Sequence, residues 1–254
     1  MTMSIRFAET DDDFKLSFQL RYKIYVEEMG RLKGESNEMR RELRDERDQS
    51  ARILIACKDQ KIVGTMRILW GGDKDFDRHQ TKMYNISPFM QSLHCNEICI
   101  IERLMVDKSC RGSSVMLRMY KEALQFIIKN KIELMLLASE PHHINHYQRL
   151  GAKAFAKIRM YEGIGPVMPM AQAMGDFEYQ KKVNSPFSML SKETDWKHFN
   201  KQEQINRIID AESLKIRSSD PHSSHHHLYS SVFETDTDDV TFSKRAKQLV
   251  RRVG

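Results

Sequence analysis

The sequence predicts a mixed α/β fold, in which helices flank a central sheet, followed by an extension that is helical and then disordered. Over the first two thirds of the chain, segments with the two-residue alternation of strands take turns with segments whose apolar residues recur at helical spacing. The longest β-branched, apolar segment, 97–106, is followed by a polar loop and then by the longest amphipathic segment, 113–131. Towards the C-terminus this alternation ends and polar residues dominate.

The order of these segments follows from periodicity and turn signals. From the N-terminus they predict a strand at 3–8, a helix from Asp11 to Gly30 that Asp11–Asp13 would cap, a charge-rich loop or exposed helix at 31–48 that is too polar to form core, and a hairpin of strands at 51–59 and 61–70. They then predict a loop at 71–86, a helical turn at 88–93, a strand at 97–106, a helix at 113–131, a buried strand at 132–139, a short helix at 145–151 and a strand at 152–163.

Past residue 187 the sequence changes character. We expect 188–216 to form one or two amphipathic helices. Residues 217–254 begin with a serine- and histidine-rich stretch and end in a charged amphipathic tail, which indicates a disordered linker and a segment that a partner could contact. The run His225–His227 could bind a metal, but no acidic residue or cysteine is placed with it, so a solvated linker is the better interpretation.

Composition narrows the class of protein. The 254 residues are 40% hydrophobic and 30% charged, as in a globular domain, and no stretch approaches the roughly 18 apolar residues of a membrane span. The N-terminus lacks the features of a secretory signal, and the four cysteines lack the paired spacing of a zinc site, so we expect a cytoplasmic protein with no metal. The net charge of +6 is spread along the chain rather than gathered in a basic stripe, which disfavours nucleic-acid binding.

The loop between the predicted strand at 97–106 and the helix at 113–131 has the composition of an anion cradle. Backbone N–H groups at a helix N-terminus bind phosphate without specific side chains, and an arginine adds a fixed cation. The candidate phosphate-binding residues are Arg111, Gly112, Ser113 and Ser114. A loop that only caps its helix with serine is the alternative reading of this segment.

A second segment, 145–152, contains Tyr147 and ends in Leu-Gly-Ala. Together with the strand–loop–helix at 104–124, it resembles the acetyl-CoA-binding signature of the GNAT (acyl-CoA N-acyltransferase) superfamily, although Ser113, Ser114 and Met116 replace glycines that are usual there. The resemblance implies a GNAT fold and an acyl donor bound by the 111–114 loop. It also implies that Tyr147 protonates the leaving thiolate, with side-chain packing as the alternative role, and that a backbone N–H between Leu104 and Val106 meets the oxyanion.

The N-terminal half resembles a narrower group within that superfamily, the autoinducer (acyl-homoserine-lactone) synthases and, more closely, the long-chain N-acyl amino acid synthases. The segments that carry the resemblance are 20–30, 45–56, 63–69 and 102–106, with further similarity at 165–174 and 184–187. The residues that match the pattern of the group are Arg21, Tyr25, Asp45, Asp48, Arg67 and Arg103. We therefore expect one acyltransferase domain at 1–187, which takes a fatty acyl chain from acyl carrier protein or acyl-CoA and places it on the amine of a small molecule such as an amino acid.

Two departures from the autoinducer synthases argue against homoserine-lactone synthesis specifically. Those enzymes carry tryptophan where this chain has Arg31, and glutamate where it has Ile100, with Glu102 nearby. The 16 methionines give mild support for a long, flexible acyl chain, although methionine is also common as core filler.

The chemistry of amine acylation is consistent with these residues. An amine must lose a proton to attack a thioester, and we expect Glu102 or Glu97 to accept that proton, with Asp45 and Asp48 as further candidates. The carboxylate of an amino-acid acceptor would be held by arginine, for which the candidates are Arg21, Arg67 and Arg103. Structural ion pairs are the alternative role for each of these charged residues.

Two other functions remain open at this stage. One is acetyl transfer from acetyl-CoA to a small molecule or a protein lysine. The other is a catalytically silent GNAT-fold module that binds an acyl carrier or a ligand, with the C-terminal segment as its output.

Overall fold

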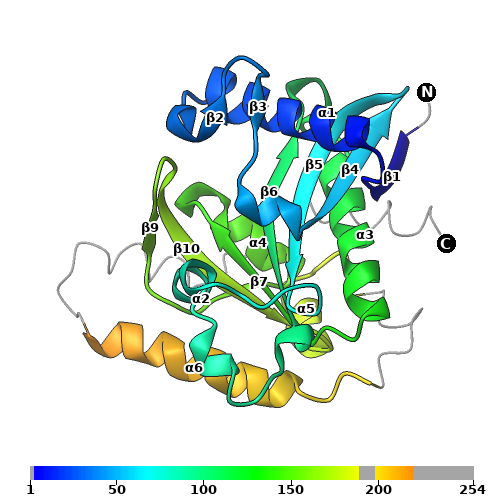
Figure 1. Cartoon of the computed structure of the whole chain (residues 1–254). Helices are drawn as coiled ribbons and strands as arrows, with labels where there is room; N and C mark the ends of the chain where they lie inside the picture. The colour runs from blue at the N-terminus through cyan, green and yellow to red at the C-terminus, as the bar shows by residue number, and fades with distance from the viewer. Residues whose placement is uncertain (1–2, 189–197, 220–254) are drawn as a thin grey trace. The chain divides into compact units, whose positions relative to one another are not determined.

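The computed structural model describes residues 3–188 and 198–219, which form two compact units (Figure 1). The first unit combines the described part of Met1–Asp75 with Cys99–Asn130 and Glu162–Ile164. The second combines Phe76–Ile98, Lys131–Tyr161 and the described part of Gly165–Gly254. The fold is of the mixed α/β type that the sequence predicts.

In the first unit, four strands pair in the order β1–β4–β5–β6, each antiparallel to its neighbour (Figure 1). Their bounds are β1 (Met3–Phe7), β4 (Arg52–Lys58), β5 (Lys61–Trp70) and β6 (Ile98–Val106). The turn between β4 and β5 places Asp59 and Gln60 at positive φ, as the tight turns that match strand twist require. The predicted hairpin and the predicted central strand are therefore confirmed.

Two helices cover opposite faces of these strands. On β4, Ile53 and Ile55 pack against α1 (Asp11–Tyr22), whereas the neighbouring Ala56 lies beside Gly64 of β5, and a Cβ on Gly64 would lie 2.7 Å from Met119 of α3 (Val115–Lys129). Successive side chains of a strand point to opposite faces, so α1 and α3 lie on the two sides. Helix α3 follows the loop at 107–114, which contains the 3₁₀ turn η6 (Lys108–Cys110).

Helix α1 begins at Asp11, and its N-cap is one residue before the predicted cap. The N-cap is Thr10, whose side chain accepts a hydrogen bond from the backbone N–H of Asp13, while the carboxylate of Asp13 accepts one from the backbone N–H of Thr10. This reciprocal capping box satisfies two backbone donors, which the acidic run alone does not do. The helix then continues as the π-helix η1 (Lys23–Glu28), in which Met29 N donates to Ile24 O at 3.0 Å.

The expectation that 31–48 contributes nothing to the core was wrong. The segment contains η2 (Lys33–Glu35), the small hairpin β2 (Ser36–Asn37) and β3 (Glu42–Leu43), and the start of η3 (Glu46–Gln49). Leu32 and Leu43 are buried against Tyr22 and Val26 of the α1–η1 segment. Two apolar residues eleven positions apart in a polar run produce no periodic signal, and for this reason the sequence pattern did not indicate them.

A β-bulge interrupts the pairing of β5 with β6. Thr65 pairs with Met105 and Arg67 with Glu102, so Arg103 and Leu104 together lie opposite the single residue Met66. Arg103 adopts a φ of 52°. A non-glycine residue in this left-handed region is uncommon and costs of the order of 1 kcal/mol, so surrounding contacts must hold it there.

In the second unit, β10 (Gly165–Ala173) pairs antiparallel with three strands, β7 (Leu134–Ser139), β8 (Lys153–Ala154) and β9 (Arg159–Tyr161). The predicted strand at 152–163 is thus two short strands that pair with different parts of β10. The helical elements of this unit are α2 (Arg78–Met83), η4 (Ser87–Phe89), η5 (Cys95–Glu97), η7 (Pro141–His143), α4 (Ile144–Leu150), α5 (Phe177–Lys182) and α6 (Gln202–Ser219). The sequence pattern predicted a loop where helix α2 lies. The helix was missed because its six residues are too few to show helical periodicity.

Helix α6 lies where the sequence predicts amphipathic helix. It buries Ile205, Ile209 and Ile216, and Asn85 donates to Glu212 at 3.1 Å. The helix ends at Ser219. The rest of the predicted linker and tail, including His225–His227, lies outside the described residues. Of the helices described, none is long and apolar enough to cross a membrane.

Candidate active site

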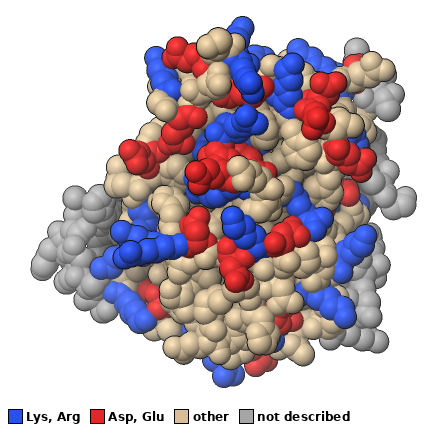
Figure 2. Space-filling view, viewed as in Figure 1, with Lys and Arg blue, Asp and Glu red and all other residues tan. Residues whose placement is uncertain are grey.

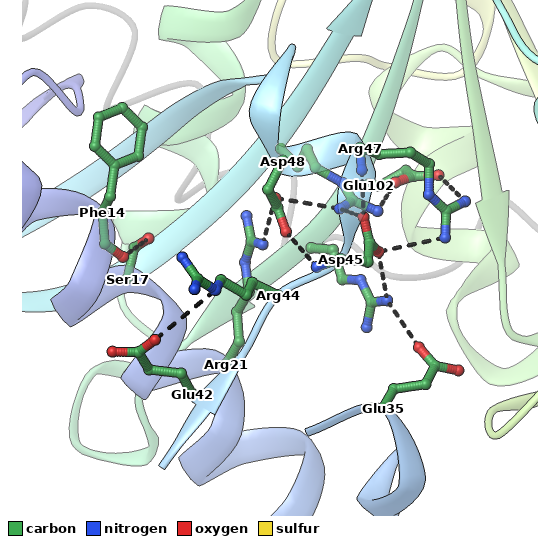
Figure 3. A network of polar contacts seen from close by, with 12 residues as sticks. Phe14, Ser17, Arg21, Glu35, Glu42, Arg44, Asp45, Arg47, Asp48 and Glu102 are labelled. Carbon is green, nitrogen blue, oxygen red and sulfur yellow. Dashed lines mark hydrogen bonds and ion pairs between the residues drawn. The ribbon is translucent and has the colours of Figure 1, made fainter. Parts of the chain in front are cut away.

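A cluster of arginines and carboxylates lies in the first unit where α1, η3, β5 and β6 come together (Figure 3). Its innermost member is Arg67 of β5, whose side chain is 0% exposed. The Nε atom of Arg67 donates to Glu102 Oε2 at 2.8 Å, and Nη2 contacts the same oxygen. Its Nη1 atom donates to Asp45 at 2.7 Å and lies 3.1 Å from Asp48. One guanidinium therefore holds three carboxylates.

Three more arginines surround this centre. Arg21 of α1 donates to Asp48 at 2.7 Å, and its guanidinium stacks over Phe18. Arg103 Nη2 lies 3.4 Å from Asp45 and its guanidinium stacks over the ring of Tyr25. Arg47 completes the set, with Nη2 at 3.3 Å from Asp45 and Nη1 at 4.0 Å from Glu102.

Local structure explains why these side chains meet. Arg67 and Glu102 are register partners on adjacent strands, so their side chains share a face. The bulge allows the next residue, Arg103, to approach Asp45 as well. Asp45 and Asp48 form a capping box at η3, in which each carboxylate accepts a backbone N–H, and this fixes both of them against the arginines.

The electrostatics of the cluster favour the ionised forms of Asp45, Asp48 and Arg67. Burial disfavours the ionised form of Asp45 and Asp48, but the neighbouring arginines outweigh it and keep the pKa of both carboxyls below the usual range. Burial also opposes the charge on Arg67, yet its three carboxylates raise the pKa well above the ordinary value. Burial dominates at Arg21 and lowers its pKa.

The cluster contains as many arginines as carboxylates, but not every arginine donor is used. Its carboxylates are Asp45, Asp48, Glu102 and Glu35, of which Glu35 lies 3.8 Å from Arg103 with 40% of its side chain exposed. The Nε and Nη2 atoms of Arg21 are buried and donate no hydrogen bond to a described residue. Arg21 and Arg67 are at most 1% exposed, whereas Arg47 is 20% exposed and lies at the rim.

Sequence reasoning named Arg21, Tyr25, Asp45, Asp48, Arg67, Glu102 and Arg103, and the structure brings all seven together. It did not name Arg47 or Glu35. Arg47 lies inside the Asp-Glu-Arg-Asp motif at 45–48, and the capping box that turns this motif back on itself is the signal that would have indicated it. No pattern in the sequence indicates Glu35.

The predicted phosphate loop lies in the same unit. Gly112 has a φ of 74°, and a Cβ built there would have no neighbour within 4 Å, so open space lies above the loop. The backbone N–H groups of Gly112 and Ser114 donate to no backbone carbonyl of the described residues. The Ser113 hydroxyl is engaged within the loop, because it donates to Cys110 O at 2.5 Å. These features fit a bound phosphate, with backbone rather than serine donors.

Ion pairs fix the loop. Asp107 accepts hydrogen bonds from Ser109 and lies 2.5 Å from Lys23 Nζ. Arg111 Nε donates to Val106 O at 3.0 Å, and its Nη2 donates to Glu28 at 2.6 Å. Leu104 and Val106 are half-buried on the strand that leads into this loop.

The remaining predicted catalytic residues belong to the second unit. Tyr147 lies on α4 and is half-buried. Glu97 ends η5 and forms an ion pair of 2.6 Å with Lys201. Burial opposes the charge on Glu97, but Lys201 lowers its pKa below the ordinary value.

Within residues 3–188 and 198–219, no group of three or more histidine, cysteine, aspartate or glutamate side chains could hold a metal ion. On the face seen in Figure 2, basic and acidic side chains are interspersed. This face therefore carries charges of both signs.

Comparison with known families decides the identity. The model of the family described as N-acyl amino acid synthase FeeM matches residues 17–172, more than half of the chain. The chain belongs to this family. It is an N-acyltransferase that acts on a small amine acceptor. No curated protein matches the sequence.

Solved structures share its fold at low sequence identity. FeeM from uncultured soil microbes is 13% identical with a TM-score of 0.57, and the match covers 76% of this chain and 99% of FeeM. The CoA-dependent acyl-homoserine lactone synthase BjaI is 14% identical with a TM-score of 0.57, over 72% of this chain and 88% of BjaI. The acyl-homoserine-lactone synthase LasI is 16% identical with a TM-score of 0.52, over 67% and 89%. The GNAT fold and the resemblance to the N-acyl amino acid synthases are thus confirmed.

Proposed function

We propose that this N-acyltransferase moves a long-chain acyl group from acyl-CoA or acyl carrier protein to the amino group of an amino acid. Membership of the FeeM family supports an amino-acid acceptor, because that family is described as N-acyl amino acid synthases. A solved structure of BjaI contains SAM and isopentyl-CoA, so a relative of this fold accepts a CoA thioester. The long chain rests on the resemblance of the N-terminal segments to the long-chain synthases.

The observation that carries the proposal is that four arginines gather in one cluster in which Arg21 keeps two buried donors, Nε and Nη2, without a hydrogen-bond partner among the described residues. An amino acid brings a carboxylate, and a carboxylate bound by arginine makes charge-assisted, often bidentate hydrogen bonds. Arg103 and Arg47 are the best candidates to contact it, because Arg47 lies at the rim and Arg103 lies 3.8 Å from Glu35, whose side chain is 40% exposed. Arg21 and Arg67 lie deeper. They would position Asp45, Asp48 and Glu102, with which Arg103 and Arg47 form ion pairs.

The donor would bind at the loop after β6. The pantetheine phosphate would be met by the backbone N–H groups of Gly112 and Ser114 and by Arg111, at the start of α3. The bulge at Arg103 and Leu104 supports this placement, because it interrupts the β5–β6 ladder where a backbone N–H between Leu104 and Val106 is proposed to meet the oxyanion.

The reaction then needs one base and one acid. The amine nitrogen attacks the thioester carbonyl, the C–N bond forms and the C–S bond breaks. The ammonium proton would pass to Glu102 or Glu97. Arginines lower the pKa of Asp45 and Asp48 and make them weak bases, Arg67 also pairs with Glu102, and Lys201 pairs with Glu97, so each candidate base must exchange its cation for the ammonium of the acceptor. Tyr147 would return a proton to the thiolate.

One assay tests this proposal. Purified protein is incubated with long-chain acyl carrier protein, with long-chain acyl-CoA or with acetyl-CoA, each with a pool of amino acids, and the products are identified by mass spectrometry. Long-chain N-acyl amino acids are the expected products. Acetylated products alone would show an acetyltransferase instead, and donor binding without any product would show a catalytically silent module.

The same assay tests the role of Tyr147. The Tyr147→Phe variant should reduce turnover by about 10²-fold or more and leave donor affinity unchanged, because general-acid catalysis contributes about that factor. An unchanged rate would assign Tyr147 to packing.

A further inference from the structure

Two residues of the loop after β6 are held by one short segment, the π-helix η1. At the start of the loop, Lys23 Nζ lies 2.5 Å from Asp107 Oδ2. Four residues later, Glu28 Oε2 accepts from Arg111 Nη2 at 2.6 Å. Lys23 and Glu28 are the first and last residues of η1. The π-helix therefore contacts the segment 107–111 of the loop with one cation and one anion.

The π conformation makes this double contact possible. In an α-helix, five residues carry a side chain about 140° around the axis, so Lys23 and Glu28 would point in different directions. A π-helix joins residues five apart by its hydrogen bonds, and this brings such residues onto one face. Met29 N to Ile24 O, at 3.0 Å, is one of these bonds. π-Helices are rare in proteins, and those that occur are often at functional sites. A contact with the proposed donor loop is consistent with that tendency.

Each ion pair fixes a different part of the loop. Asp107 is 3% exposed, and its Oδ1 accepts from Ser109 N at 3.0 Å and from Ser109 Oγ at 2.6 Å, which shapes the first turn. Lys23 binds the other oxygen of Asp107, so its loss would leave a buried carboxylate without its cation. Glu28 and the carbonyl of Val106 hold the guanidinium of Arg111 from two sides.

We propose that Lys23 and Glu28 are positioning residues for the acyl donor, and that η1 sets the loop at 107–111 in the shape that receives the donor phosphate. The inference rests on the proposed donor site at Arg111, Gly112 and Ser114. It adds that donor affinity depends on side chains of η1 that need not touch the donor. An anion-binding loop gains affinity when its donors are fixed before binding, because less ordering accompanies the binding step.

Glu28 could instead compete with the donor phosphate for Arg111, and the two roles predict opposite changes in donor affinity. A carboxylate beside Arg111 neutralises charge that a phosphate would use, so a competing Glu28 would weaken donor binding. If Glu28 positions Arg111, Glu28→Gln weakens donor binding; if Glu28 competes, the same substitution strengthens it.

The experiment is isothermal titration calorimetry of coenzyme A, as the probe, into the full chain. We expect Lys23→Met to raise the Kd about tenfold and Glu28→Gln about threefold to tenfold, of the order of one charge-assisted contact. Lys23→Arg keeps the cation and should stay within about twofold of the parent chain. Glu27→Gln is the matched control, because Glu27 lies on the same π-helix but pairs with Arg41, and it should leave the Kd unchanged.

Hydrogen exchange separates positioning from general loss of stability. In the absence of coenzyme A, the amides of 107–114 should exchange faster in Lys23→Met and Glu28→Gln, whereas those of β4 and β5 should exchange as in the parent chain. This readout does not depend on binding and applies to whichever variant folds.

The outcomes distinguish this inference from the proposed donor site. If Arg111→Ala weakens coenzyme A binding while Lys23→Met and Glu28→Gln do not, the inference is overturned and the donor site stands. If Arg111→Ala leaves the affinity unchanged, or the parent chain binds neither coenzyme A nor acyl carrier protein, the donor site is wrong and the inference falls with it. Tighter binding by Glu28→Gln also overturns the inference.

Discussion

At the scale of single residues, Arg67 is the buried arginine at the centre of the cluster. It is fully buried and contacts Asp45, Asp48 and Glu102, three carboxylates that would otherwise repel one another inside the protein. Removing one partner from a buried ionic group leaves uncompensated charge, which is a strongly destabilising change. The sequence indicated Arg67 only through resemblance to a family pattern, because an arginine in an otherwise apolar strand has no periodic signature.

The substitution Arg67→Met should lower the free energy of unfolding by about 3–5 kcal/mol, the usual cost of breaking a buried ion pair from one side. Arg52→Met is the matched control, since Arg52 on the adjacent strand pairs with Asp73 at the surface, where the median contribution is about 0–1 kcal/mol. Urea unfolding followed by circular dichroism measures both. Equal losses in the two variants would mean that the cluster does not stabilise the fold through Arg67.

At the scale of elements, periodicity located the strands and the long helices but not the departures from regular structure. The strand β6 was expected from its apolar run, whereas its bulge was not, because an extra residue in one strand changes pairing without changing composition. The π-helix was likewise not predicted, because it lies within 11–30, a segment whose pattern indicates a helix without distinguishing its type. The hairpin at 36–43 was missed because its two anchoring leucines are isolated in a polar run. The irregular elements are therefore the ones that place Arg103, Lys23 and Glu28.

The segment that precedes α6 depends on another buried carboxylate. Glu133 is 4% exposed, and burial raises its pKa although it accepts the backbone N–H groups of Asn200 and Lys201. Its Oε2 atom has no hydrogen-bond partner among the described residues. A carboxyl whose pKa is raised by folding stabilises the fold below its unfolded pKa, near 4.3, and that stability is lost as the pH rises through the folded value.

The variant Glu133→Gln should therefore raise the Tm relative to the parent chain, and by more at pH 7 than at pH 4.5. A glutamine can still accept the same backbone hydrogen bonds but carries no charge at either pH. Differential scanning calorimetry at the two pH values measures the effect. Glu178→Gln serves as the control, because that side chain is exposed on α5 and should change the Tm little at either pH. A gain that is equal at both pH values would contradict the assigned role of burial.

At the scale of the whole molecule, the order of strands and helices predicted the mixed α/β fold, and the resemblance of the segments 104–124 and 145–152 to a known signature predicted its GNAT type. The FeeM family model confirms the group within it. The site was predicted in parts. Residues of the arginine cluster were named from resemblance and are found in contact, whereas Arg47 and Glu35 were identified only from three-dimensional proximity. Tyr147 and Glu97 lie in the second unit, and their catalytic roles remain predictions.

The central claim is that the arginine cluster binds the carboxylate of an amino-acid acceptor, and the most direct test is a comparison of that acceptor with its primary amide. The two differ only in the charged group, so kcat/KM should fall at least about tenfold for the amide, equivalent to one charge-assisted hydrogen bond. Arg103→Met should lower kcat/KM for the acid and remove most of the difference. Arg44→Met, a largely exposed arginine outside the cluster, should preserve it. Equal kcat/KM values for acid and amide in the parent chain would contradict the account.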